Sequence, residues 1–82
     1  MNDDIRKSLH ELLDRIVDFN ASHSRYELVA EFSDEYVSID NKEENLYDDF
    51  FADANFNRGT GDTEIRALIN DIDDYEREIK YA

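Results

Sequence analysis

The chain has 82 residues and carries 22 Asp and Glu against nine Lys and Arg, which gives a formal charge of −13 at pH 7. It has no Cys, which excludes disulfides and thiolate metal sites, and its apolar runs fall short of the roughly 18 residues of a membrane span. The N-terminus lacks the pattern of a signal peptide, so we expect a cytoplasmic protein that does not associate with membranes.

The size and composition predict one folded domain over residues 1–82. Apolar residues make up 40 % of the chain and recur at regular spacings, unlike those of a disordered acidic segment. A core this small leaves little room for a catalytic cleft. The sequence also contains no nucleophile elbow and no glycine-rich phosphate loop, so we predict neither enzymatic activity nor a cofactor.

The first predicted element is a helix that Asn2 or Asp3 caps. Its apolar residues recur at steps of three and four and are expected to share one face: Ile5, Leu9, Leu12, Leu13, Ile16 and Val17. The charges on the other face are nearly balanced, which favours a structural role for this helix.

A β-hairpin follows, because the apolar period changes to two. Tyr26 to Phe32 alternates as a strand with one buried face, and Tyr36 to Asp40 forms a second strand with Val37 and Ile39 on one side. Glu27 and Glu31 then lie on the exposed face of the hairpin. A two-stranded ribbon is marginal alone, so we expect it to pack on the helices.

Two interpretations fit residues 46–56. Helical spacing of Leu46, Phe50 and Ala54 favours a short second helix, with acidic residues opposite. The competing interpretation is a third strand through Phe51 to Phe56, because aromatic residues favour strands. Either element gives an α+β fold with an N-terminal helix, a hairpin and a C-terminal helix.

The last helix is predicted to begin at Asp62 or Thr63. Its apolar stripe consists of Ile65, Leu68, Ile69, Ile72, Tyr75 and Ile79. Next to this stripe, four carboxylates fall within about 80° on the helical wheel: Glu64, Asp71, Asp74 and Glu78. They span about 21 Å along the axis, and neighbouring charges lie roughly 5 to 10 Å apart, a spacing comparable to that of nucleic-acid phosphates.

The charge predicts binding to a basic protein surface. A net charge of −13 on a short chain causes self-repulsion that a basic partner would relieve. A rigid array of carboxylates can also accept hydrogen bonds from the same Lys and Arg side chains that bind phosphates. Besides the four carboxylates of the last helix, the expected contact residues are Asp48, Asp49, Asp53, Glu27 and Glu31. Tyr36, Tyr47 and Tyr81 are candidate aromatic anchors among them. The charge opposes direct binding of nucleic acid, and a solvated face that only maintains solubility is the simpler alternative.

In its short Cys-free chain, acidic surface and order of elements, the sequence resembles the small phage-encoded anti-CRISPR proteins that occupy the DNA-binding surface of a nuclease. The resemblance implies a stoichiometric inhibitor of a CRISPR effector or another nuclease, acting in the host cytoplasm as a DNA mimic. An acidic adaptor or immunity-type protein that binds a basic partner without mimicking DNA is the alternative. Sequence leaves open whether the chain is a monomer or a dimer.

A second alternative is a calcium module, because Asp53, Asn55, Asn57 and Glu64 occupy positions 1, 3, 5 and 12 of an EF-hand loop. Position 6, which needs Gly, holds Arg58, so the match is incomplete. His10 and His23 are too far apart for the His pair of a helical metal site, and both are expected at the surface.

Overall fold

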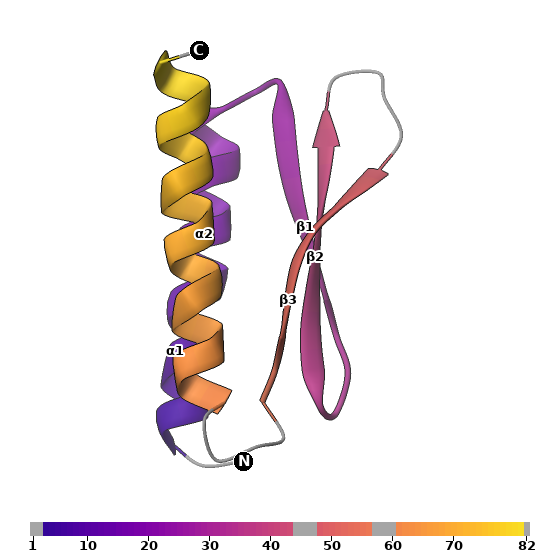
Figure 1. The fold of residues 1–82 in the computed structure, drawn as a ribbon, viewed down its shortest axis with the longest axis vertical. Helices are drawn as coiled ribbons and strands as arrows, with labels where there is room; N and C mark the ends of the chain where they lie inside the picture. Colours follow the sequence, from indigo (N-terminus) through magenta and orange to yellow (C-terminus); the bar gives the residue numbers. More distant parts are fainter. Residues whose placement is uncertain (1–2, 44–47, 57–60, 82) are drawn as a thin grey trace.

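The computed structural model describes residues 3–43, 48–56 and 61–81, and it has the expected α+β fold. Its elements are α1 (Asp3–Ser22), β1 (Tyr26–Phe32), β2 (Tyr36–Glu43), β3 (Asp48–Asn55) and α2 (Gly61–Tyr81). The three strands form an antiparallel sheet in the order β1-β2-β3. Both helices lie on the same face of this sheet and run parallel to each other (Figure 1). Helix α1 contacts β1 and α2 contacts β3, so the opposite face of the sheet carries no helix.

Helix α1 buries a narrower stripe than its sequence predicts. Ile5, Leu9, Leu12, Ile16 and Phe19 enter the core, as the heptad-like spacing requires. The expectation that Leu13 and Val17 share this buried face is wrong, because they are 41 % and 64 % exposed. They lie on the flank of α1 that points away from α2, where only the edge strand β1 lies beneath the helix.

The predicted hairpin is confirmed, and β2 extends three residues further than expected, to Glu43. Its turn is closed by the Ser33 amide, which donates to the Tyr36 carbonyl at 2.9 Å. Val37 and Ile39 are fully buried, whereas Glu27 and Glu31 lie exposed on the opposite face. The period of two therefore identified the two faces of the hairpin correctly.

Residues 48–55 form a strand, so the helix favoured for this segment is wrong and the third-strand interpretation is confirmed. The strand pairs Ala54 with Val37 and Ala52 with Ile39, and then Phe50 with Asp40, which leaves Phe51 as the extra residue of a β-bulge. The bulge turns Phe51 toward α2, where its ring lies 5.5 Å from that of Tyr75. This interruption explains why the segment does not alternate as a simple strand.

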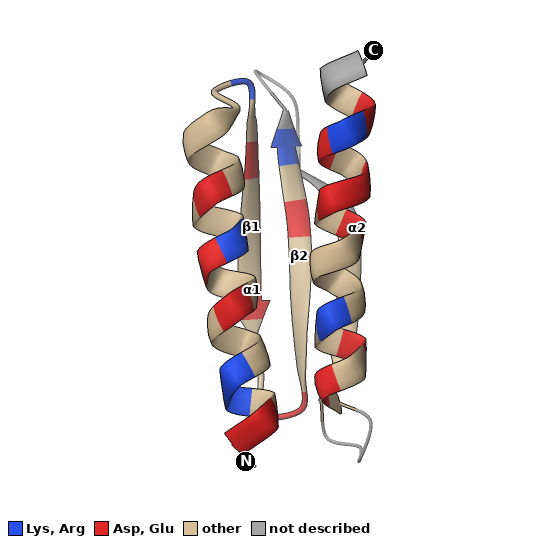
Figure 2. Cartoon of the chain, turned by 90° about the vertical axis from the view of Figure 1, so that its left-hand side faces the viewer, with Lys and Arg blue, Asp and Glu red and all other residues tan. Residues whose placement is uncertain are grey.

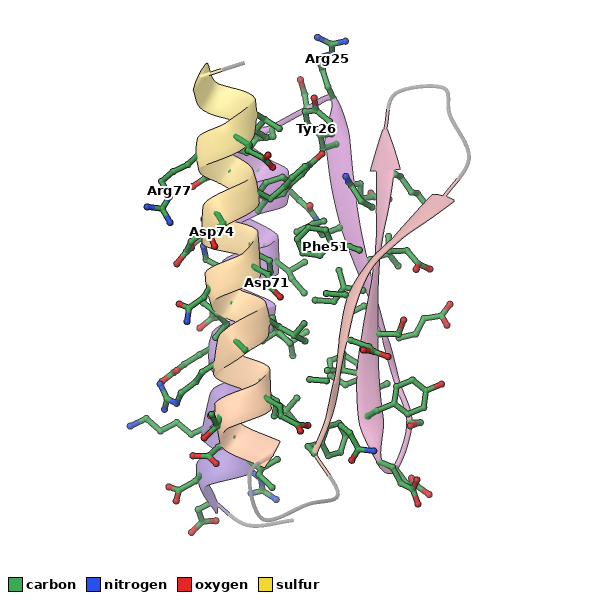
Figure 3. The ribbon with its side chains drawn as sticks, viewed as in Figure 1. Arg25, Tyr26, Phe51, Asp71, Asp74 and Arg77 are labelled. Atoms are coloured by element: carbon green, nitrogen blue, oxygen red, sulfur yellow. The ribbon has the colours of Figure 1, made fainter. Side chains whose placement is uncertain are left out.

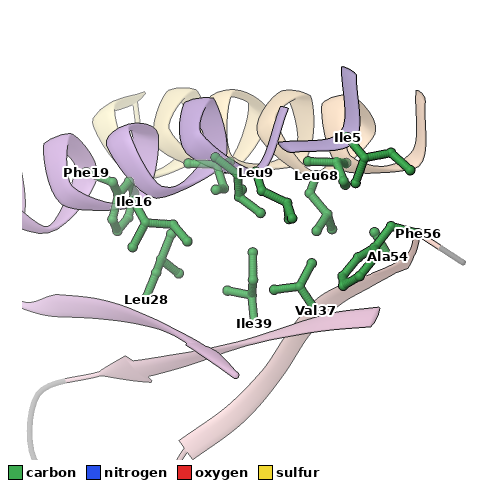
Figure 4. Packing of buried hydrophobic residues seen from close by; sticks show 13 residues of the cluster. Ile5, Leu9, Ile16, Phe19, Leu28, Val37, Ile39, Ala54, Phe56 and Leu68 are labelled. Atoms are coloured by element: carbon green, nitrogen blue, oxygen red, sulfur yellow. The ribbon is translucent and has the colours of Figure 1, made fainter. Parts of the chain in front are cut away.

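The core lies between the helix layer and the sheet (Figure 4). Helix α2 contributes Ile65, Leu68 and Ile72, with Ile69, Tyr75 and Ile79 partly buried beside them, as its predicted stripe requires. Tyr75 also accepts a hydrogen bond at 2.8 Å from the amide of Asn41, a half-satisfied polar residue at the sheet's inner face. In the described part of the chain, neither helix is long and apolar enough to cross a membrane.

Candidate partner-binding surfaces

The structure divides the predicted acidic residues between two surfaces. Asp71, Asp74 and Glu78 lie exposed on the flank of α2 that faces away from α1, and we call these three residues the acidic helix flank. The second surface is the uncovered face of the sheet. Four of its carboxylates form what we call the acidic sheet face: Glu27, Glu31, Asp40 and Asp53.

The acidic helix flank follows successive turns of α2. Its members are three and four residues apart, so neighbouring Cβ atoms lie about 5–6 Å from each other. Arg77 donates to Asp74 and offsets part of this charge (Figure 3). Glu64, the fourth residue of the predicted stripe, is only partly exposed, and its buried Oε2 has no partner among the described groups. The predicted stripe therefore presents its charge mainly through its C-terminal half.

The acidic sheet face is set by strand register. Ser38 of the central strand pairs with Glu31 on one side and Asp53 on the other, so these two carboxylates share a row about 10 Å wide. Asp40 lies between the two edge strands and was not among the predicted contacts, because a lone Asp in a short strand gives no signal of its own. The side chains of Asp48 and Asp49 lie outside the described part, although their backbone belongs to β3.

Tyr36 adds an aromatic side chain to the same face. It is 45 % exposed and precedes the inward-pointing Val37, so it lies on the uncovered side of the sheet, as expected of an anchor. The other two candidate anchors, Tyr47 and Tyr81, lie outside the described side chains.

Cationic side chains are used to join the two helices. Arg15 of α1 donates through Nε to Asp73 Oδ1 at 2.7 Å and through Nη2 to Glu76 Oε1 at 2.8 Å. Arg66 of α2 reaches back to Glu11 at 3.3 Å. Each pair spans more than 50 residues, so no local pattern could have predicted it. Arg15 and Arg66 therefore offset charge at the helix–helix seam. Figure 2 shows further basic residues along both helices and at the end of β2, where Lys42 lies opposite Glu27 of β1.

Glu76 is the centre of this seam. Its Oε2 lies 2.8 Å from His23 Nε2, while its Oε1 accepts from Arg15. The hydrogen bond with His23, together with Arg15, lowers the pKa of Glu76 despite its burial. Burial lowers the pKa of Arg15, but its bonds to Asp73 and Glu76 outweigh that effect and raise it.

The expectation of a surface position holds for His10 but is wrong for His23. His23 is part-buried, and its ring centroid lies 4.7 Å from that of Phe19. The turn after α1 folds back against α2 and gives this side chain both an aromatic and an acidic neighbour.

The EF-hand alternative is contradicted by the fold. Asp53 and Asn55 belong to β3 and Glu64 lies inside α2, whereas an EF-hand loop is flanked by two helices. Asn57 lies outside the described residues. Within residues 3–43, 48–56 and 61–81, no group of three or more acidic or His side chains is placed to hold a metal ion.

Comparisons with protein-family models, with curated proteins and with solved structures find no match.

Proposed function

We propose that this protein is a non-enzymatic binding protein that occupies the basic, nucleic-acid-binding surface of another protein. The observation that carries the proposal is the uncovered acidic sheet face, because both helices pack on the opposite side and leave Glu27, Glu31 and Asp53 exposed. The acidic helix flank supplies a second set of carboxylates. A groove lined with Lys and Arg gains affinity when it releases counterions, and rigid carboxylates satisfy the same donors.

The rigidity of the scaffold supports this role. The sheet rows fix Glu31 and Asp53 relative to each other, and the Arg15 bonds fix α2 against α1. Carboxylates held on regular elements lose little freedom on binding, and their summed field accelerates encounter with a basic partner. Exposed Tyr36 offers an apolar contact within the charged surface. A nuclease, and a CRISPR effector in particular, is the target class that the resemblance implies, with the protein acting as a stoichiometric inhibitor.

Charge reversal on the two surfaces tests the proposal. The variants are E31K with D53K on the sheet face, and D71K, D74K and E78K together on the helix flank. The assay measures how well the protein displaces a fluorescent DNA duplex from a guide-loaded CRISPR effector, with the target site in the duplex. The same measurement is made with an unrelated nuclease. Exposed ion pairs contribute about 0.2–1 kcal/mol each, so losing two or three and adding repulsion should weaken competition roughly 10- to 100-fold.

The matched control for the sheet-face variant is D14K with D18K, which also replaces two carboxylates by Lys, on the solvent face of α1. It should compete like the unaltered protein after allowance for net charge. Binding that never displaces the duplex would identify an adaptor instead of a mimic. Equal losses for the control and the test variants would show that only net charge matters and would refute the assignment of these surfaces.

A further inference from the structure

The flank of α1 that points away from α2 forms a strip beside the free edge of β1. Its residues follow each other at steps of three and four and so lie on one line along the helix: Arg6, His10, Leu13, Val17 and Asn20. The first two are basic or titratable, the next two are exposed apolar residues, and the last is a polar residue that touches the sheet. In a chain with a net charge of −13, a strip that combines basic and apolar side chains is unusual.

The Asn20 side chain makes, at one residue of this edge, the two hydrogen bonds that a neighbouring strand would make. Its Nδ2 donates to the Leu28 carbonyl at 3.0 Å, and its Oδ1 accepts from the Leu28 amide at 2.8 Å. Both backbone groups of Leu28 therefore point away from β2. Nearer the start of the strand, the Tyr26 amide donates to the His23 carbonyl at 3.2 Å. The first half of the β1 edge is thus satisfied from within the protein.

The second half of the edge is open. Backbone groups of an antiparallel edge strand alternate between the neighbouring strand and the free side, so Ala30 and Phe32 point the same way as Leu28. Within the described part of the chain, no hydrogen bond reaches the backbone of Ala30 or Phe32 from that side. Edge strands of this kind are templates for another strand.

An apolar groove lies directly beside Phe32. Its volume is about 390 Å³, and it is lined by Arg6, Leu9, His10, Leu13 and Phe32. Leu13 and Phe32 are 41 % and 47 % exposed, so the groove opens to solvent along the strand edge. A strand added to β1 would place every second side chain in this groove and the others on the acidic sheet face.

We propose that β1 binds an extended peptide segment of a partner by strand addition at Ala30 and Phe32. The segment alternates apolar residues, which enter the groove against Leu13 and Phe32, with Lys or Arg, which lie beside Glu27 and Glu31. Charge complementarity fixes which side chains face which way. Arg6 repels cations from the groove, and the two Glu residues attract them to the outer face.

A second copy of this chain fits the edge poorly. Antiparallel pairing of two β1 strands that brings Ala30 opposite Phe32 puts Glu31 directly opposite the same residue of the other copy, and like charges in that position are destabilising. The other edge of the sheet is a weaker template. Strand β3 carries the bulge at Phe51 and is rich in Asp, both of which hinder strand addition.

The proposal stands apart from nucleic-acid mimicry and is tested with a capped octapeptide of alternating Lys and Val. The readout is hydrogen exchange of single amides by NMR. At ten times the dissociation constant, exchange of the Ala30 and Phe32 amides should slow about tenfold, because only the free fraction exchanges. The Leu28 amide, already bonded to Asn20, should change little. Alternating Glu and Val, and a block peptide of four Lys then four Val, should produce no such slowing.

Two substitutions locate the site, and a third serves as control. Ala30→Pro removes the outward backbone donor without removing a hydrogen bond to β2, and Leu13→Asp places a carboxylate beside the groove. Each substitution should weaken binding of the Lys–Val peptide at least about tenfold. Asp18→Ala, on the solvent face of α1, should not. The proposal is overturned if the peptide perturbs only residues of the acidic sheet face without slowing Ala30 and Phe32, a result that would leave the proposed function intact. It is also overturned if both folded variants bind like the unaltered protein.

Discussion

The Asn20 side chain joins the end of α1 to the edge of β1, and its removal is the sharpest test of how the edge is protected. Asn20→Ala deletes two hydrogen bonds to Leu28, each with a net value of about 0.5–1.5 kcal/mol. Ala is a better helix former than Asn by up to about 0.7 kcal/mol, which offsets part of the loss. We therefore expect the free energy of unfolding to fall by roughly 1–2 kcal/mol, which corresponds to a decrease of about 5–15 °C in Tm.

Urea denaturation measures the loss, and hydrogen exchange locates it. The Leu28 amide should exchange faster in the variant than global unfolding explains. Asn70→Ala is the matched control, because Asn70 is exposed on α2 and the chemical change is identical. It should be neutral or slightly stabilising. If Asn20→Ala costs no more than Asn70→Ala and leaves Leu28 exchange unchanged, the side chain does not satisfy the strand edge.

Two further predictions concern polar groups inside the fold. Since the folded pKa of Glu76 is lowered, its contribution to stability is complete above its usual value of 4.5 and is lost as the pH falls through the folded value. Glu76→Gln should therefore lower the free energy of unfolding by roughly 1–2 kcal/mol at pH 7 and by progressively less below pH 4.5. If urea denaturation shows the same difference between the variant and the unaltered protein down to pH 2.5, the ionised Glu76 does not stabilise the helix–helix seam. Ser8 is fully buried in α1, and no described group bonds its Oγ. Ser8→Ala should raise the free energy of unfolding by up to about 1 kcal/mol, whereas a loss of that size would show that the hydroxyl has a partner.

The third element shows where local pattern becomes insufficient. Residues 46–56 match helical spacing and strand composition about equally well. The segment forms a strand because the free side of β2 is paired in this way, with Ala54 opposite Val37 and Ala52 opposite Ile39. A two-stranded ribbon would leave one side of β2 unpaired beneath two helices. The bulge at Phe51 then gives the core an aromatic residue that strict alternation would have turned outward.

The two long helices, the hairpin and the acidic excess could be predicted from the sequence, because each depends on spacing or composition within one segment. Which charges are offset depends on contacts between elements that are distant in the chain. Arg15 is bound to residues 58 and 61 positions away, so Asp73 and Glu76 belong to the helix seam, while Asp71 and Asp74 on the same helix face solvent. The structure also decided the fate of Leu13 and Val17. A three-stranded sheet is too narrow to cover the outer flank of α1, so two of the six residues in an apolar stripe predicted to be core lie exposed beside β1.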